Sequence, residues 1–297
     1  MVDENGLALV ATAEMGGSLA DAFALLRVAG RHAVPLPLAE SMLAHHLAGL
    51  AGCSVVDGPV TLAIADGAGV EGAEVNVRLA SVPWARACRR VCYVIGDPVE
   101  VVVLDVDACD VEPDRNLAGE PRDAVTFVGV PERCGTVPYG VEHVFELMAL
   151  SRCALMTGAL ERILELSVRY AEERQQFGRP IGKFQAVQHQ LAVLAGEVAA
   201  ALRATDAAVS ALGSARFDVA VAAAKARVGE AAGIGAEIAH QAHGAMGYTH
   251  EHTLHHFTRR LLAWRDEYGR EAHWQARLGR RAVSLGADRT WELVVGS

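Results

Sequence analysis

Three carboxylates cluster near the end of the chain in the stretch AWRDEYGREAHW, residues 263–274. Asp266, Glu267 and Glu271 lie there between two tryptophans, with arginines beside them. A carboxylate shielded from water can act as a general base, because desolvation brings its proton affinity closer to the working pH. Acidic residues at a helix end are also commonly no more than solubilising charge. The residue types therefore leave open which of the three acids, if any, takes part in chemistry.

A second stretch with chemical character is ERQQFGRPIGKFQAVQH, residues 173–189. It places Arg174, Gln176 and Phe177 just before Gly178 at an expected helix end. The planar guanidinium fork suits a phosphate or a carboxylate, the amide offers donors, and the ring offers an apolar face. The alternative is an arginine at a helix C-terminus and a phenylalanine that anchors the turn.

The third stretch is HQAHGAMGYTHEH, residues 240–252. Gln241 and the glycines Gly244 and Gly247 would let backbone amides approach a ligand closely, although a glycine helix end followed by a loop would look the same. No cysteine or acid joins the histidines here at a familiar zinc spacing, so we predict packed or solvated histidines and no metal site. The histidines concerned are His240, His243, His250, His252, His255 and His256.

Composition excludes several classes of protein. The 297 residues carry a net charge of −9, which argues against a nucleic-acid-binding protein. No run approaches the roughly 18 apolar residues of a membrane span, and no basic segment precedes an apolar one at the N-terminus, so we expect a cytoplasmic protein. The cysteines form no CxxC pair, which favours reduced thiols. They are Cys53, Cys88, Cys92, Cys109, Cys134 and Cys153.

Hydrophobic periodicity divides the chain into three regions, which we predict as domains at 1–56, 57–135 and 136–297. Residues 18–52 predict two helices broken at AVPLP. Short runs rich in Val, Ile and Thr between 59 and 130 predict a small antiparallel sheet or barrel, and no GxGxxG motif accompanies them. From about residue 140 onward, long Ala-rich helices and then shorter ones predict a helical bundle. The fold class is mainly α with a small β domain.

Roughly residues 140–285 closely resemble the C-terminal helical domain of the acyl-CoA dehydrogenases. The resemblance rests on three segments and their order: RYAEERQQFGRPIGKFQAVQHQLA, AAAKARVGEAAGIGAEIAHQAHGAMGYTHE and FTRRLLAWRDEYGREAHW. The middle region is similar to a shortened form of the family's small β domain. The resemblance implies an acyl-CoA dehydrogenase-like fold with truncated N-terminal helices, a reduced antiparallel β domain and a C-terminal bundle.

The resemblance also implies an activity, the α,β-desaturation of an acyl-CoA thioester with FAD as cofactor. In that family a glutamate takes the α-proton while hydride passes from Cβ to the flavin N5. The spacing of Glu267, Gly269 and Glu271 matches the family pattern around the base, which points to Glu267, with Asp266 facing another direction. The positions that match FAD contacts made to a neighbouring subunit are Arg174, Gln176 and Phe177, and, at the diphosphate, Gln241, Gly244 and Ala245.

This sequence departs from the family where the flavin ring is normally wrapped. The stretch LAIADGAGVEGAE, residues 62–74, stands in place of the Thr-Glu-Pro…Gly-Ser-Asp segment. The resemblance therefore implies a larger acyl-CoA dehydrogenase partner in an α2β2 heterotetramer, a bulky acyl group such as a steroid-derived one, and an electron-transferring flavoprotein as acceptor. The alternative is a non-catalytic scaffold subunit that completes the partner's FAD site. In the family the base serves its own chain's flavin, whereas Arg174 and Gln241 serve the neighbour's, so the sequence leaves open whose flavin Glu267 serves.

Overall fold

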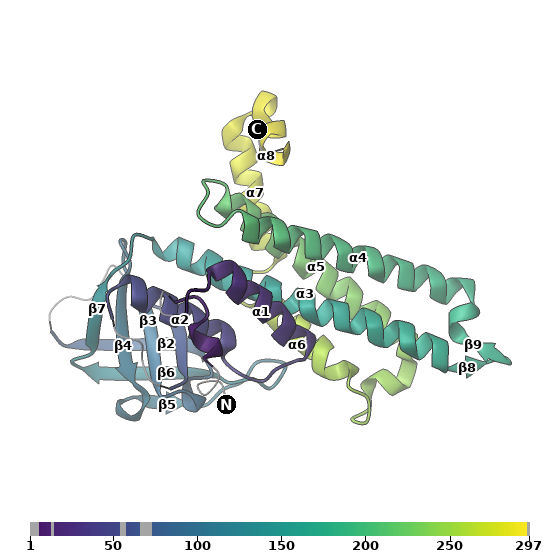
Figure 1. Cartoon of the computed structure of the whole chain (residues 1–297), viewed down its shortest axis with the longest axis horizontal. Helices are drawn as coiled ribbons and strands as arrows, with labels where there is room; N and C mark the ends of the chain where they lie inside the picture. The colour runs from purple at the N-terminus through teal and green to yellow at the C-terminus, as the bar shows by residue number, and fades with distance from the viewer. Residues whose placement is uncertain (1–5, 13–14, 54–57, 66–72, 296–297) are drawn as a thin grey trace. The chain divides into compact units, whose positions relative to one another are not determined.

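The computed structural model describes residues 6–12, 15–53, 58–65 and 73–295, drawn in colour in Figure 1. They form two compact units. Unit 1 comprises Met1–Leu26 and Pro35–Met148, and unit 2 comprises Arg27–Val34 and Ala149–Ser297. The mainly α fold class with a small β region is confirmed, whereas the three domain boundaries stay a prediction.

The two helices expected in 18–52 are confirmed. They are α1 (Leu19–Arg31) and α2 (Leu38–Leu50), and a short 3-10 turn, η1 (Leu7–Leu9), precedes them. α1 begins with a local cap, because the Ser18 hydroxyl accepts a hydrogen bond from the Asp21 amide and the Asp21 carboxylate accepts one from the Ser18 amide.

The β region of unit 1 contains two sheets. The first has the order β1 (Val60–Ile64), β3 (Arg90–Ile95), β4 (Glu100–Asp105), β7 (Glu132–Thr136). The second has the order β2 (Val75–Pro83), β6 (Arg122–Gly129), β5 (Asp110–Glu112), and the 3-10 turns η2 (Ala85–Ala87) and η3 (Val106–Ala108) lie in the connections. Segment 62–74 lies partly outside the described residues.

The expected antiparallel pairing is found in both sheets, and one strand pair departs from it. β1 pairs with β3 in parallel, with Val60 opposite Arg90, whereas the other pairs in both sheets are antiparallel. Between β1 and β3 the chain forms β2 in the other sheet and then re-enters the first sheet in the same direction. A strand of a second sheet thus serves as the crossover that parallel pairing requires. Inward residues of both sheets form one core, which includes Val91, Tyr93, Leu104, Val125 and Phe127.

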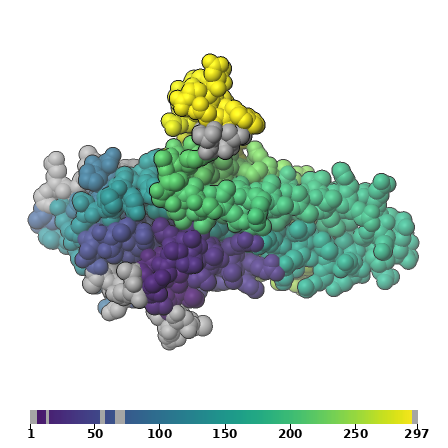
Figure 2. All heavy atoms as spheres, turned by 45° about the horizontal axis from the view of Figure 1, so that its top comes forward, coloured from purple at the N-terminus to yellow at the C-terminus, as the bar shows by residue number. Residues whose placement is uncertain are grey.

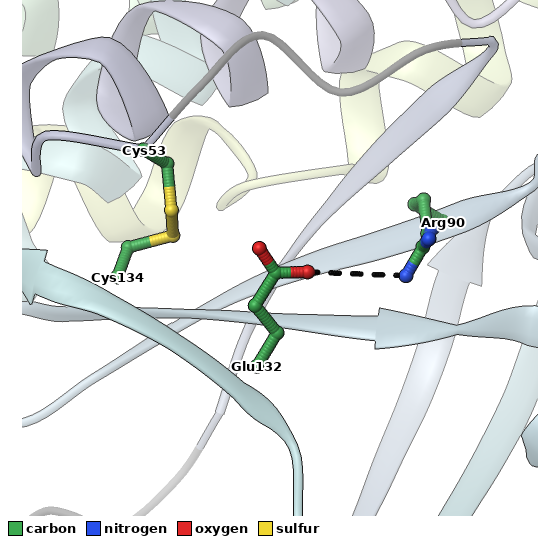
Figure 3. Close-up of a disulfide and its surroundings, with 4 residues drawn as sticks. All are labelled: Cys53, Arg90, Glu132 and Cys134. Carbon is green, nitrogen blue, oxygen red and sulfur yellow. Dashed lines mark ion pairs between the residues drawn. A yellow bond between two sulfur atoms is a disulfide. The ribbon is translucent and has the colours of Figure 1, made fainter.

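The prediction that all six cysteines are reduced is wrong. Cys53 and Cys134 form a disulfide, which Figure 3 shows. Their Cα atoms lie 5.3 Å apart. It joins the residues that follow α2 to strand β7, near the ion pair between Arg90 and Glu132 at 3.9 Å. The sequence gives no local signal for this pair because 81 residues separate the two cysteines. The other four cysteines are not part of this disulfide.

Helices follow from Val141 to the end of the described chain, and all of them except the first residues of α3 lie in unit 2. α3 (Val141–Glu173) is followed by a small hairpin of β8 (Gln175–Gln176) and β9 (Arg179–Pro180), the turn η4 (Ile181–Lys183), and the long helices α4 (Gln185–Ser210) and α5 (Phe217–His243). The turn η5 (Gly244–Tyr248) leads into α6 (Leu254–Asp266), α7 (Glu271–Leu285), η6 (Ala287–Arg289) and α8 (Thr290–Val295). α5 packs against α4, α6 and α7, so it is the central helix of this group. No helix among the described residues is long and apolar enough to cross a membrane.

Candidate functional site

The turn between α6 and α7 carries the candidate base. Glu267 caps the end of α6 in an extended conformation, with φ −76° and ψ 141°. Tyr268 and Gly269 then adopt left-handed conformations, with φ of 52° and 88°. A Cβ at Gly269 would lie 2.8 Å from Nε1 of Trp274, so glycine is required both for the backbone conformation and for the close approach of the indole.

The three acids of this segment have different surroundings. The Glu267 carboxylate accepts a hydrogen bond from Nε of Arg152 at 2.6 Å, and the two side chains are 16% and 1% exposed. Asp266 is 49% exposed and pairs with Arg270 on the outside of the turn, so it faces another direction from Glu267, as expected. Of the two adjacent acids, only Glu267 is directed into the bundle.

Glu271 is held in an ion pair of its own. Its carboxylate accepts hydrogen bonds from Nε and Nη2 of Arg265 at 2.5 and 3.1 Å. Burial alone would raise the pKa of Glu271, but the hydrogen bond from Arg265 and the positive charges of Arg265 and Lys225 bring this pKa below its ordinary value. Glu271 also begins α7, where the helix dipole favours a negative charge. These contacts give Glu271 a structural role beside Glu267.

Two buried donors hold the carbonyl groups of the turn. Nζ of Lys225, on α5, donates to the carbonyl oxygens of Arg265 and Gly269, both at 2.8 Å, and this side chain is among the largest fully buried ones. Nε1 of Trp274, on α7, donates to the carbonyl oxygens of Tyr268 at 3.0 Å and Gly269 at 3.2 Å. Burial lowers the pKa of Lys225, while the nearby Cys153, Glu271 and Glu267 favour its charged form.

The residues expected to contact a neighbour's FAD lie elsewhere in unit 2. Arg174 follows the last residue of α3, and Gln176 and Phe177 form the β8–β9 hairpin. All three are exposed, and Phe177, at 92% exposure and φ 51°, makes an edge contact with Phe184. Gln241, Gly244 and Ala245 are also exposed, at the end of α5 and the start of η5.

Aromatic contacts bring these two expected segments to the same end of the bundle. Tyr170, four residues before Arg174, stacks on His243, the last residue of α5, with ring centroids 4.5 Å apart. His243 in turn lies 4.6 Å from the ring of His252. Within the described part of the chain, no group of three or more His, Cys, Asp or Glu side chains is placed to hold a metal ion.

The candidate base lies at the other end of α6 from this cluster. α6 runs for 13 residues between the residues that follow η5 and Glu267, which corresponds to about 20 Å of helix. The structure therefore brings the Arg174 and Gly244 segments together and separates both from Glu267 by the length of α6. This helix is labelled in Figure 1.

Arg152, Lys225 and Trp274 were not identified as site residues from the sequence. A usable signal was present for two of them. Arg152 interrupts the apolar run ALSRCALM, and Lys225 interrupts the alanine run AVAAAKA. A single basic residue on the buried side of a helix needs a specific partner, because burial of an unpaired charge is costly.

Comparison with known proteins agrees with this architecture. Residues 140–281 match the family model described as "Acyl-CoA dehydrogenase, C-terminal domain". Acyl-CoA dehydrogenase FadE34 of Mycobacterium tuberculosis is 31% identical over 280 residues, which is 89% of this chain. Residues 140–281 therefore belong to the C-terminal domain family of the acyl-CoA dehydrogenases. The match of this chain spans only 38% of the length of FadE34.

The match with this chain spans a larger share of two further relatives. Acyl-CoA dehydrogenase IpdE2 of Mycobacterium tuberculosis is 29% identical over 85% of this chain and 76% of its own. The solved structure described as the Tcur3481–Tcur3483 steroid ACAD variant superposes with a TM-score of 0.83 at 25% identity. It covers 95% of this chain and 87% of the other. The chain therefore covers most of the length of both of these relatives.

Proposed function

We propose that the chain is a subunit of an FAD-dependent acyl-CoA dehydrogenase that desaturates an acyl-CoA thioester at Cα–Cβ, with Glu267 as the base. The observation that carries the proposal is the environment of Glu267. It is the acid of the α6–α7 turn that is directed inward, it is largely shielded from water, and Arg152 fixes its orientation. In addition, residues 140–281, which include this turn, match the C-terminal domain model of the acyl-CoA dehydrogenases.

The residues at the other end of α6 fit an FAD that belongs to a neighbouring subunit. The Arg174 guanidinium and the Gln176 and Gln241 amides are exposed and supply donors suited to a diphosphate. Gly244 has φ 58°, and a Cβ built on it would meet nothing within 4 Å, so its backbone faces open space. Exposed Phe177 adds an apolar surface at the hairpin. These side chains reach outward, as contacts to another subunit require.

The chain's own residues would contribute position and a proton acceptor. Glu267 would accept the α-proton of the thioester, and partial exclusion of water around it would make an otherwise weak base more effective. The Arg152 guanidinium would keep the carboxylate correctly oriented before the transfer. FAD, when bound, supplies the two-electron acceptor for the hydride leaving Cβ.

We propose a larger acyl-CoA dehydrogenase chain as the partner, in an α2β2 heterotetramer. Figure 2 shows the C-terminal residues, in yellow, projecting from the green helices of the same unit. Val283 and Trp291 in this segment are 82% and 68% exposed, and Tyr248 at the end of η5 is 72% exposed. We assign these exposed apolar side chains to the contact with the partner chain.

The substrate, acceptor and location belong to the same proposal. The solved Tcur3481–Tcur3483 steroid ACAD structure supports a steroid-derived or similarly bulky acyl group as substrate. It also supports a role in steroid degradation, a branch of lipid metabolism. The family resemblance supports an electron-transferring flavoprotein as acceptor and the cytoplasm as location.

A second candidate function is that of a non-catalytic scaffold that completes the partner's FAD site. The contact between Glu267 and Arg152 favours it, because a carboxylate held by a buried guanidinium is also what a purely structural ion pair looks like. In this case Arg174 and Gln241 would be the functional residues, and Glu267 would only stabilise the turn.

The deciding experiment uses the complex co-expressed with the partner chain. The flavin content of this chain purified alone and of the complex is compared first; we expect flavin only in the complex. Glu267→Gln is then compared with Asp266→Asn, a neighbouring carboxylate on the outside of the turn. We expect Glu267→Gln to lower turnover of a steroid-side-chain CoA thioester by about 10²-fold or more with normal flavin content, while Asp266→Asn has little effect. Full turnover by Glu267→Gln would remove Glu267 as the base and leave the scaffold function.

A further inference from the structure

Lys225 is a buried cation whose hydrogen-bond partners are the carbonyls of the candidate active-site turn. It lies on the central helix α5, in a segment otherwise rich in alanine, and only 1% of it is exposed. Its two hydrogen bonds, both 2.8 Å long, go to the carbonyl oxygens of Arg265 and Gly269. These two residues lie two positions before and two positions after Glu267. One ammonium group thus bridges the two ends of the segment that carries the base.

This arrangement is not what packing alone would select. A position on the buried side of a central bundle helix is normally filled by leucine, methionine or alanine, and burying an ammonium there costs free energy unless its donors are satisfied. The cost is tolerated when the charge provides something that an apolar residue cannot. Here it provides two hydrogen bonds to a backbone segment that has lost its helical partners.

The turn needs such support because of its backbone. Tyr268 is a non-glycine residue in the left-handed region, with φ 52°, and residues of this kind persist only where surrounding contacts impose the conformation. Trp274 supplies one set of contacts through its Nε1 bonds to Tyr268 and Gly269. Lys225 supplies a second set, through its bonds to Arg265 and Gly269. Of these two donors, Lys225 is the one that also binds the helix side of the turn, at Arg265.

We infer that Lys225 is a positioning residue, which fixes the α6–α7 turn and thereby the direction in which Glu267 presents its carboxylate. The inference rests on the proposed function in so far as it concerns catalysis. Lys225 does not exchange a proton with the substrate in this role. It acts through the backbone carbonyls of residues 265 and 269, whereas Arg152 acts on the carboxylate itself.

The test is Lys225→Met in the complete complex with its partner chain, compared with Leu194→Ala. Leu194 is fully buried on α4 and packs near Gly235 on α5, so the control also destabilises the bundle but does not contact the turn. Two quantities are measured: backbone amide exchange of residues 265–271, and kcat and KM for a steroid-side-chain CoA thioester. We expect Lys225→Met to increase exchange in the turn about tenfold. We also expect kcat to fall about 10²-fold with KM little changed, since the base would be misplaced and binding would not be.

The control should show the opposite pattern. Leu194→Ala should lower the thermal midpoint while leaving exchange in the turn and kcat near the wild-type values. If Lys225→Met does not fold, Lys225→Gln replaces it, because an amide keeps N–H donors in a side chain no longer than lysine. A smaller rise in exchange and a smaller fall in kcat are then expected. Wild-type exchange in the turn together with wild-type kcat, in either variant, overturns the inference.

The two measurements also separate this inference from the proposed function. If Glu267→Gln leaves turnover unchanged but Lys225→Met increases exchange in the turn, Lys225 holds the turn and only the catalytic role of Glu267 is lost. If Glu267→Gln abolishes turnover while Lys225→Met changes neither quantity, the proposed function stands and the inference fails.

Discussion

The contact between Arg152 and Glu267 gives a prediction whose size can be worked out from the structure. Arg152 is 1% exposed and Glu267 is 16% exposed, with 2.6 Å between Nε and the carboxylate oxygen. Removing one partner of a buried ion pair costs about 3–5 kcal/mol, because the other charge loses its compensation. Since Glu267 keeps some contact with water, we expect Arg152→Met to lower the free energy of unfolding by about 3 kcal/mol, at the lower end of that range.

A double-mutant cycle isolates the pair from the other interactions of these two side chains. Glu267→Gln removes the negative charge, so the combined variant no longer contains an uncompensated carboxylate. We expect the losses of Arg152→Met and Glu267→Gln to be non-additive, with a coupling of about 1–2 kcal/mol. Asp266→Asn is the matched control, because this neighbouring acid is exposed and pairs only at the surface, and its expected effect is below about 0.5 kcal/mol.

Urea unfolding followed by tryptophan fluorescence is a suitable assay. Trp264 and Trp274 are buried, at 3% and 0% exposure, and both report on unit 2, where the ion pair lies. Losses from the two single substitutions that add within about 0.5 kcal/mol in the double variant would show that the two groups do not interact in solution. This result would refute the assignment of Arg152 as the partner that orients Glu267.

Two other predictions concern different parts of the molecule. The disulfide between Cys53 and Cys134 closes a separation of 81 residues, for which loop-closure entropy gives at most about 4.5 kcal/mol. The double variant Cys53→Ser/Cys134→Ser should therefore unfold at a markedly lower urea concentration. In the denatured wild-type chain, thiol titration should find four thiols before reduction and six after it. Finding six thiols without reductant would contradict the disulfide. Burial, opposed by a hydrogen bond to the Ala239 carbonyl, lowers the pKa of His243, so the unfolded state takes up a proton more readily than the folded state. The free energy of unfolding should then fall as the pH drops below about 6.5. In His243→Gln, the difference between the free energies of unfolding measured by urea titration at about pH 7.5 and about pH 5.5 should be smaller than in the wild type. An equal difference in the two proteins would count against a role of His243 in this pH dependence.

Local features were enough to predict most of the fold. The break at Pro35 and Pro37 and the long runs of small apolar residues after residue 140 specify helices by periodicity, which is a property of neighbouring residues. The parallel pairing of β1 with β3 is not such a property, since it depends on β2 leaving for another sheet. The disulfide likewise joins positions with no local relation.

In the candidate site too, residues close in sequence could be predicted together and residues far apart in sequence could not. The turn around Glu267 was predicted from its spacing and from the family resemblance, because Glu267, Gly269 and Glu271 are close in sequence. Arg152 lies 115 residues away from Glu267, and Lys225 lies 40 and 44 residues from the carbonyls that it binds. Their side chains meet the turn only because α3, α5 and α6 pack together, so a single sequence could mark them as unusual buried charges but not as partners of this turn.

The two proposed roles of Glu267 place different demands on Arg152. As a base, Glu267 becomes protonated, and its ion pair with the guanidinium is then reduced to a weaker hydrogen bond between a cation and a neutral carboxyl group. As part of a scaffold, Glu267 never changes protonation, so the ion pair stays the same at every stage. An acyl-CoA analogue with an anionic, enolate-like oxygen should therefore weaken the coupling between Arg152 and Glu267 in the complex if Glu267 is the base. In a scaffold subunit the coupling measured with and without that analogue should be equal.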